Sequence, residues 1–329
     1  MDRSLDLSRW RDVPRGVGYR RWTILQTGLR QLLKTRFFRL LLLIAWMGGI
    51  AIGALGFVFS QSVASGGWLE TAAIQLGARP QAIAAATGAF VLLFPEICIG
   101  GVFTGIFWLH SFLGLGLSLV ALTALVPRLL SRDRATHALT VYLSRPLTSV
   151  DYLLGKLGII LGVLALMWTG PLLGGWLLSL LFAPERDFWY YSLAPLRQAL
   201  IFHAIAVVTL ASLALGISAL SKTPRFTVML WLGLWIVAGT VAKPDEAPRW
   251  LSRASFTHNL GEVRQHIFRL DTAFKAAAEN LPLLDPNWVE KFSKAGRKAE
   301  PKDVAGSAWA LGAFVLLASG VFFRKLRAE

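Results

Sequence analysis

Long, nearly uninterrupted apolar runs are the feature of this 329-residue sequence that most restricts its fold. A helix that crosses a bilayer needs roughly 20 consecutive apolar residues, and the sequence contains several runs of that length. Only 16% of the residues are charged, whereas soluble domains carry roughly 25%. The short alternating segments typical of a transmembrane β-barrel do not occur. The sequence therefore predicts an all-α polytopic membrane protein.

We expect six transmembrane helices. The third contains Gly170-Pro171, which should kink it because proline removes a backbone donor. The expected spans are residues 38–59, 102–126, 153–182, 198–220, 226–241 and 307–323.

The distribution of basic residues sets the expected orientation. The net charge is +15, and the Arg and Lys residues crowd the first 39 residues, the segment 133–156 and the C-terminal tail. Basic residues in short segments beside apolar runs mark the cytoplasmic face, where they also meet anionic lipid. Membrane topology therefore explains the charge better than a nucleic-acid partner does, and both termini are expected in the cytoplasm.

The first 36 residues are expected to form a cytoplasmic lead followed by an amphipathic helix. Residues 19–36 place apolar and polar side chains on opposite helical faces, which is typical of a helix lying at the membrane surface. A cytoplasmic extension of the first span is the alternative. The apolar face holds Trp22, Leu25, Leu29, Leu32 and Leu33, and the polar face holds Arg20, Arg21, Gln26, Arg30 and Lys34.

Two regions are expected on the outer side. Residues 60–101 carry few charges, and within them residues 82–94 should form an interfacial or re-entrant helix packed on the outer mouth. Residues 243–305 are hydrophilic and should form a small helical cap over the spans. A helix is expected within them at 259–281, with Leu260, Val263, Ile267, Leu270 and Phe274 on one face. The chain thus divides into 1–36, the transmembrane helices of 37–242, the loop 243–305 and the last span with its tail, 306–329.

Motifs for enzymatic chemistry are lacking in the sequence. There is no phosphate-binding Gly-rich loop, no Gly-x-Ser-x-Gly and no His-Glu-x-x-His, and Cys98 is the single cysteine. His110 and His203 lie within spans, where packing is a more common role than proton or metal binding. His258 and His266 are eight positions apart and roughly share a helical face, which by itself is a weak signal for a metal site. We expect no catalytic, cofactor-binding or metal-binding residues in this chain.

The segment 133–156, DRATHALTVYLSRPLTSVDYLLGK, separates the second and third spans. Residues 134–143 can form a short helix with one apolar face, and Arg145-Pro146 should end it. The next helix should begin near Ser149 or Asp151, either of which can cap it. A short helix between two spans is suited to dock on another protein. An ordinary cytoplasmic loop is the alternative.

This segment resembles the first cytoplasmic loop of ABC-2-type permeases, the membrane subunits of ATP-binding-cassette transporters. The resemblance rests on Asp133-Arg134, on Leu139, on Leu143-Ser144-Arg145-Pro146 and on the run Tyr152-Leu153-Leu154-Gly155-Lys156. His137-Ala138 departs from the Gly-Thr that is usual in the family. The long loop before the last span resembles the longer-loop bacterial members, such as permeases of nitrous-oxide-reductase maturation.

The resemblance implies a function. Residues 134–143 would be the coupling helix, and six spans would follow an N-terminal elbow helix, in a bacterial inner membrane. The partners would be two copies of a P-loop ATPase subunit and a second permease subunit, identical or not, together with membrane lipid and possible extracytoplasmic proteins. ATP and Mg would bind the partner ATPase rather than this chain. The residues implied to contact that ATPase are Arg134, Leu139, Tyr142, Leu143 and Arg145.

Two other functions remain open from the sequence. A stand-alone secondary transporter would need intramembrane carboxylates, and the spans contain almost no ionisable residues. A membrane anchor for an extracytoplasmic complex would use residues 243–303. A membrane enzyme is disfavoured because no set of nucleophile, acid and base, or metal ligands converges in the sequence.

Overall fold

The computed structural model describes residues 16–64, 67–135, 148–181, 183, 185–241, 249–280, 290, 294 and 301–327. This part of the chain is helical and contains no strand. Five stretches are long and apolar enough to cross a membrane: Arg36–Val63, Glu96–Asp133, Val150–Leu181, Arg186–Leu220 and Val304–Lys325. The protein is therefore a helical, multi-pass membrane protein.

The fifth of the six expected spans is shorter than the others. It corresponds to α11 (Pro224–Val241), whose apolar stretch falls below the length of the five longer helices. At 1.5 Å per residue its 18 residues cover about 27 Å, slightly less than the hydrocarbon core of roughly 30 Å. Five long helices and one short one thus stand where the sequence predicts six full spans.

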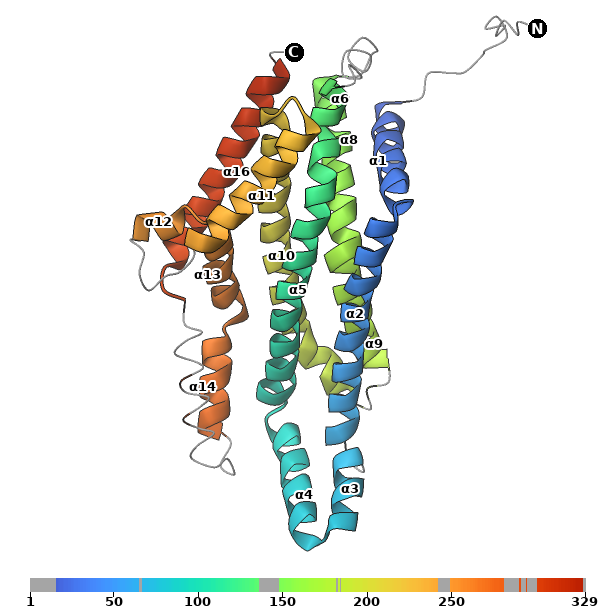
Figure 1. Ribbon diagram of the computed structural model, residues 1–329. Coiled ribbons are helices and arrows are strands. Elements are labelled where there is room, and N and C mark those ends of the chain that lie inside the picture. The colour runs from blue at the N-terminus through green and yellow to red at the C-terminus, as the bar shows by residue number, and fades with distance from the viewer. Residues whose placement is uncertain are drawn as a thin grey trace, which may run out of the picture.

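The two cytoplasmic ends predicted from the charge pattern lie together. Figure 1 shows the start of α1 (Val17–Leu33), α6 (Ser131–Ala135) and the end of α16 (Val304–Arg327) at one end of the bundle. At the opposite end α3 (Trp68–Leu76) and α4 (Ala78–Leu93) form a hairpin.

Close backbone approach joins α2 (Arg36–Val63) to α9 (Gly170–Leu181). A Cβ atom added at Gly175 would overlap the carbonyl oxygen of Gly49, and one added at Gly49 would lie 2.6 Å from the carbonyl oxygen of Pro171. Further along, Gly53 faces Leu178. Because lipid tails are as apolar as the side chains, membrane helices associate through such close packing of small residues.

The same kind of contact joins α1 to α8 (Ser149–Leu164). Gly155, Gly158 and Gly162 of α8 face Ile24, Leu25 and Leu29 of α1, so the two helices run parallel. A helix is therefore present where the amphipathic helix is expected. However, α1 lies along α8 and continues the general direction of α2 (Figure 1), as the alternative of an extended first span predicts. Its apolar face packs on protein, and Trp22 is exposed.

The central helix of the bundle is α10 (Arg186–Leu220), which packs against α5 (Gly101–Leu129), α13 (Phe256–Phe268) and α16. In the most apolar stretch of α10, 67% of the residues are buried within the protein, whereas in that of α16 only 11% are. Small residues such as Ala206, Ala211 and Ala214 make this central position possible.

The third span contains the predicted irregularity. The π-helical turn η3 (Ala165–Thr169) separates α8 from α9, and Pro171 follows directly. Proline lacks the N–H that a regular helix requires, so the preceding turn widens instead of continuing as α-helix.

The expected helix at 82–94 is part of the hairpin of α3 and α4. Gly77 joins these helices with φ of 108°, a left-handed conformation that favours glycine. The hairpin projects beyond the ends of α2 and α5 (Figure 1) and does not fold back between the helices.

Part of the region expected to cap the bundle lies beside it instead. The helix α13 (Phe256–Phe268) packs against α16 and α10, with Phe256, Leu260 and Phe268 buried. The expected continuous helix over 259–281 is wrong, because Arg269 has φ of 48° and separates α13 from α14 (Leu270–Asn280). The hydrophilic composition of residues 243–305 suggested a cap. The helix α13 nevertheless has one apolar face, and packing against the side of the bundle removes that face from water.

Polar side chains connect α13 to neighbouring segments. Ser255 Oγ donates to the carbonyl oxygen of Ala238 at 2.6 Å, which ties the start of α13 to α11. The carboxylate of Glu262 accepts hydrogen bonds from the backbone N–H groups of Lys302 and Asp303 at 2.7 and 3.0 Å. These bonds explain how a polar segment is accommodated beside apolar helices.

We predict that Gly175→Ala destabilises the protein by roughly 1–3 kcal/mol, because the added methyl group overlaps the backbone of α2. The matched control is Gly116→Ala, since nothing lies within 4 Å of the added atom there. The control should be neutral or stabilising by up to about 1 kcal/mol. Unfolding in detergent, followed by tryptophan fluorescence, measures both. Equal effects of the two substitutions would contradict the packing described.

Candidate functional site

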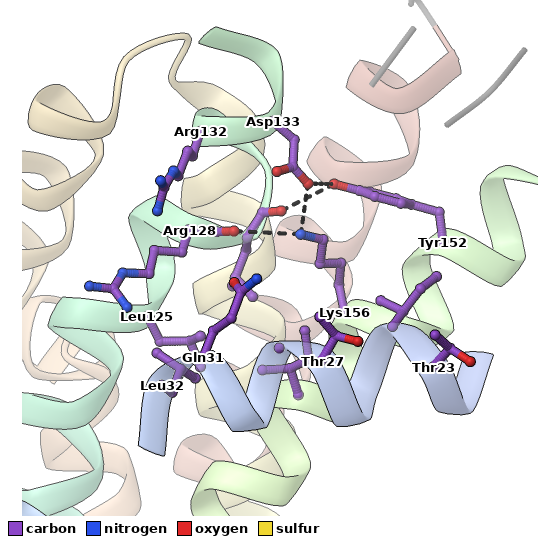
Figure 2. Close-up of a pocket in the computed structure, with 14 residues that line it drawn as sticks. Thr23, Thr27, Gln31, Leu32, Leu125, Arg128, Arg132, Asp133, Tyr152 and Lys156 are labelled. Carbon is purple, nitrogen blue, oxygen red and sulfur yellow. Dashed lines mark hydrogen bonds and ion pairs between the residues drawn. The ribbon is translucent and has the colours of Figure 1, made fainter. Parts of the chain in front are cut away.

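A cluster of three polar side chains connects the beginning and the end of the segment 133–156. Asp133 Oδ2, in the middle of α6, accepts a hydrogen bond from Tyr152 Oη at 2.6 Å. The same oxygen lies 2.7 Å from Lys156 Nζ in an ion pair. Figure 2 shows Asp133 meeting Tyr152 and Lys156, which both project from α8. We call Asp133, Tyr152 and Lys156 the clasp.

The clasp also contacts the carboxyl end of α5. Tyr152 Oη lies 3.1 Å from the carbonyl oxygen of Leu129, and Lys156 Nζ lies 3.5 Å from that of Arg128. The last carbonyl groups of a helix have no partner within the helix, and a nearby cation stabilises them. Tyr152 is buried, and the side chains of Asp133 and Lys156 are only 15% and 12% exposed. Water therefore screens this ion pair much less than it screens a surface pair.

The start of α8 is fixed by a capping box. Thr148 Oγ1 accepts a hydrogen bond from the backbone N–H of Asp151, and the Asp151 carboxylate accepts one from the backbone N–H of Thr148. The expectation that Ser149 or Asp151 would be the cap is wrong, because Thr148 occupies that position. The Thr-x-x-Asp spacing is the sequence signal that was missed.

Asp151 also links α8 to α1. Arg21 Nε donates to Asp151 Oδ1 at 2.8 Å, across 130 positions of sequence. The polar face of α1 thus supplies an ion pair at one end of the helix contact, while Ile24, Leu25 and Leu29 supply the apolar packing that follows. This combination fixes the register of α1 on α8.

A pocket of about 330 Å³ lies between α1, the end of α5, α6 and α8, beside the clasp (Figure 2). Its polar walls are Thr23, Thr27 and Gln31 of α1, Arg128 of α5, Arg132 and Asp133 of α6, and Tyr152 and Lys156 of α8. Apolar side chains complete it, among them Leu32, Leu125 and Ile159. The pocket therefore combines several cations with an apolar wall at one end of the bundle.

Most residues expected to contact a partner ATPase cannot be placed. Leu139, Tyr142, Leu143 and Arg145 lie in 136–147, outside the described residues, and so does most of the expected coupling helix at 134–143. The backbone of Arg134 belongs to α6. The structure brings together Asp133, Tyr152 and Lys156, three residues of the motif that resembles the family loop. The sequence alone does not show that their acid, hydroxyl and basic groups contact one another.

The two histidines within the bundle, His110 and His203, are both buried. His203 Nε2 lies 2.7 Å from Thr169 Oγ1, and its ring packs edge-on against Trp168 at 4.5 Å between centroids. His110 is buried on α5. No group of three or more potential metal ligands occurs among the described residues, which include His258 and His266 on α13.

We predict that Asp133 and Lys156 are energetically coupled. A double-mutant cycle of Asp133→Asn and Lys156→Gln should give a coupling free energy of roughly 1–3 kcal/mol, because both partners are largely buried. The control cycle uses Arg253→Gln and Asp303→Asn, whose side chains are 51% and 39% exposed. That cycle should give less than about 1 kcal/mol. The free energy of unfolding in detergent is measured for each variant, and equal coupling in the two cycles would contradict the burial of the clasp.

Comparison of the sequence with protein-family models finds no match, and neither does comparison with curated proteins.

Proposed function

We propose that this chain is the permease subunit of an ABC transporter of the ABC-2 type. The observation that supports the proposal is the clasp. Asp133 stands at the beginning of the segment that resembles the family loop, and Tyr152 and Lys156 stand at its end. Contact between them holds α6 and the start of α8, which flank residues 136–147, at the same end of the bundle as the start of α1 and the end of α16 (Figure 1).

In this proposal, residues 136–147 transmit movement between a partner ATPase and the bundle. The clasp attaches that segment to α5 through the carbonyl groups of Arg128 and Leu129, and to α8 through Tyr152 and Lys156. A displacement of residues 136–147 would therefore move α5 and α8 together. Leu139, Tyr142 and Leu143 would supply apolar contacts to the ATPase, and Arg134 and Arg145 would supply polar ones.

ATP and Mg bind the ATPase subunits, and hydrolysis occurs there and not in this chain. Two copies of the ATPase and a second permease subunit complete the transporter in a bacterial inner membrane, with both termini of this chain cytoplasmic. ATP binding changes the population of inward-facing and outward-facing states only because the ATPase dimer has different affinities for the two states.

The alternative functions are a stand-alone secondary transporter and an anchor for an extracytoplasmic complex. The burial of α13 beside α10 and α16 disfavours the anchor, because those residues contact the bundle instead of an outside partner.

We predict that the chain purifies from its native membrane with a P-loop ATPase, identified by mass spectrometry. The double substitution Leu139→Glu with Leu143→Glu should remove the ATPase from the complex, because charged side chains would replace apolar contacts. The matched control is Ile74→Glu with Leu76→Glu, at exposed positions of α3 near the other end of the bundle. The control should keep the ATPase.

Two results would contradict the proposal. One is isolation of an intact, functional chain with no ATPase. The other is retention of the ATPase and of transport by the Leu139→Glu, Leu143→Glu variant.

A further inference from the structure

The pocket beside the clasp has an excess of positive charge. Among its lining residues Arg128, Arg132 and Lys156 are cationic and Asp133 is the carboxylate. Asp133 is already paired with Lys156 at 2.7 Å. Arg128 and Arg132 are one helical turn apart in sequence, and in Figure 2 their side chains extend to the same side, away from the ion pair of Asp133 and Lys156. The pocket is thus electrostatically suited to an anion.

The walls also offer neutral hydrogen-bond donors. Thr23, Thr27 and Gln31 follow one another along the exposed side of α1, at intervals of four residues. Within the described part of the chain, the side chains of Thr27, Gln31 and Arg128 make no hydrogen bond or ion pair with other residues. Hydroxyl, amide and guanidinium groups from two helices therefore line the same space, and all of them can donate to phosphate oxygens.

The position of the pocket identifies the kind of anion. Arg128 and Arg132 lie at the end of the apolar stretch Glu96–Asp133, and Lys156 lies near the beginning of Val150–Leu181. The polar ends of two candidate spans are the depth at which phospholipid headgroups lie. Leu32, Leu125 and Ile159 give the pocket an apolar wall, and the neighbouring surface exposes Phe37 and Leu40 at the start of α2.

The size and walls of the pocket disfavour a nucleotide. Its volume of about 330 Å³ is near the lower limit for small-molecule pockets, roughly 300 Å³. The aromatic residue in the wall, Tyr152, is 2% exposed, so its ring face is not open for stacking on a base. A phosphate with a glycerol backbone fits this volume and this distribution of polar and apolar groups better.

We propose that this pocket binds the phosphate group of an anionic phospholipid. Arg128 and Arg132 contact the phosphate, Thr27 and Gln31 donate to its oxygens or to the headgroup, and the acyl chains leave along the exposed apolar residues at the start of α2. Arginine is well suited to this role because its planar group binds phosphate through two hydrogen bonds. Basic pockets at the ends of transmembrane helices bind lipid headgroups in the same way.

A bound lipid would connect three helices that the clasp and the glycine contacts already bring together. It would bridge α1 to the end of α5 and to α6, which the Arg21–Asp151 pair does not reach. The lipid would therefore act as a structural component next to residues 136–147. This site does not depend on the identity of any partner protein.

The test uses the purified full-length chain in neutral detergent. Phosphatidylglycerol, phosphatidylcholine with the same acyl chains, and glycerol 3-phosphate are titrated separately, with binding followed by native mass spectrometry and by thermal unfolding. We expect phosphatidylglycerol to bind and to raise the melting temperature, and the other two to have little effect. Substituting Arg128→Gln with Arg132→Gln should weaken phosphatidylglycerol binding by about tenfold or more, because two charge-assisted contacts are lost.

The matched control is Lys222→Gln with Arg225→Gln, which removes the same charge near the same end of the bundle but outside the pocket. It should leave phosphatidylglycerol binding unchanged. A second variant, Thr27→Val with Gln31→Leu, keeps the charge and changes exposed positions of α1, so it tests the site even if the arginine variant does not fold. It should also weaken binding.

Three results would overturn the proposal. Equal weakening by the pocket and control variants would mean that phosphatidylglycerol responds to overall charge. An equal response to glycerol 3-phosphate would mean a site for soluble phosphates. Full binding by both pocket variants would place the lipid elsewhere.

Discussion

Close packing at glycine residues between two parallel pairs of helices is the constraint on which the rest of the structure depends. The contact of α2 with α9 brings backbone against backbone at Gly49 and Gly175, and in the contact of α1 with α8 the side chains of Ile24, Leu25 and Leu29 fill the space beside Gly155, Gly158 and Gly162. In a bilayer the hydrophobic effect does not drive one apolar helix against another, so van der Waals contact over a long, closely packed interface must do so. These contacts set the position of α8, and the position of α8 determines where Tyr152 and Lys156 meet Asp133.

The clasp shows how the same low-polarity surroundings affect charges. Asp133 and Lys156 are mostly removed from water, so each must satisfy the other. Removing one partner would leave a poorly solvated charge at the end of α5. The clasp and the pocket beside it also share residues, since Asp133 and Lys156 pair with each other and also line the pocket together with Arg128 and Arg132. A structural ion pair thereby determines the electrostatic character of the adjacent cavity.

The sequence predicted the elements whose signal is local. Apolar runs identified the helical class and the five long helices, and Gly170-Pro171 marked the irregular third span. Predictions that depended on three-dimensional packing were less accurate. The amphipathic pattern of α1 does not distinguish lipid from α8 as the surface it covers, and the polar composition of 243–305 conceals the buried face of α13. Of the candidate site, the sequence supplied the motif residues but not the contact between Asp133 and Lys156, which lie 23 positions apart.

Regular α-helix is interrupted between α1 and α2 and again between α8 and α9, and the two interruptions lie side by side in the bundle. Contacts such as Gly28 with Ile159 and Leu29 with Gly162 fix the alignment of α1 with α8. Extended along the chain, this alignment places the break between α1 and α2, at Lys34 and Thr35, beside the π-helical turn that begins at Ala165. Two helices packed side by side change direction together only where regular α-helical hydrogen bonding is interrupted in both. If the section made of α1 and α8 tilted against the section made of α2 and α9, the change in backbone direction would fall at this shared level, because both chain segments are continuous α-helix on either side of it.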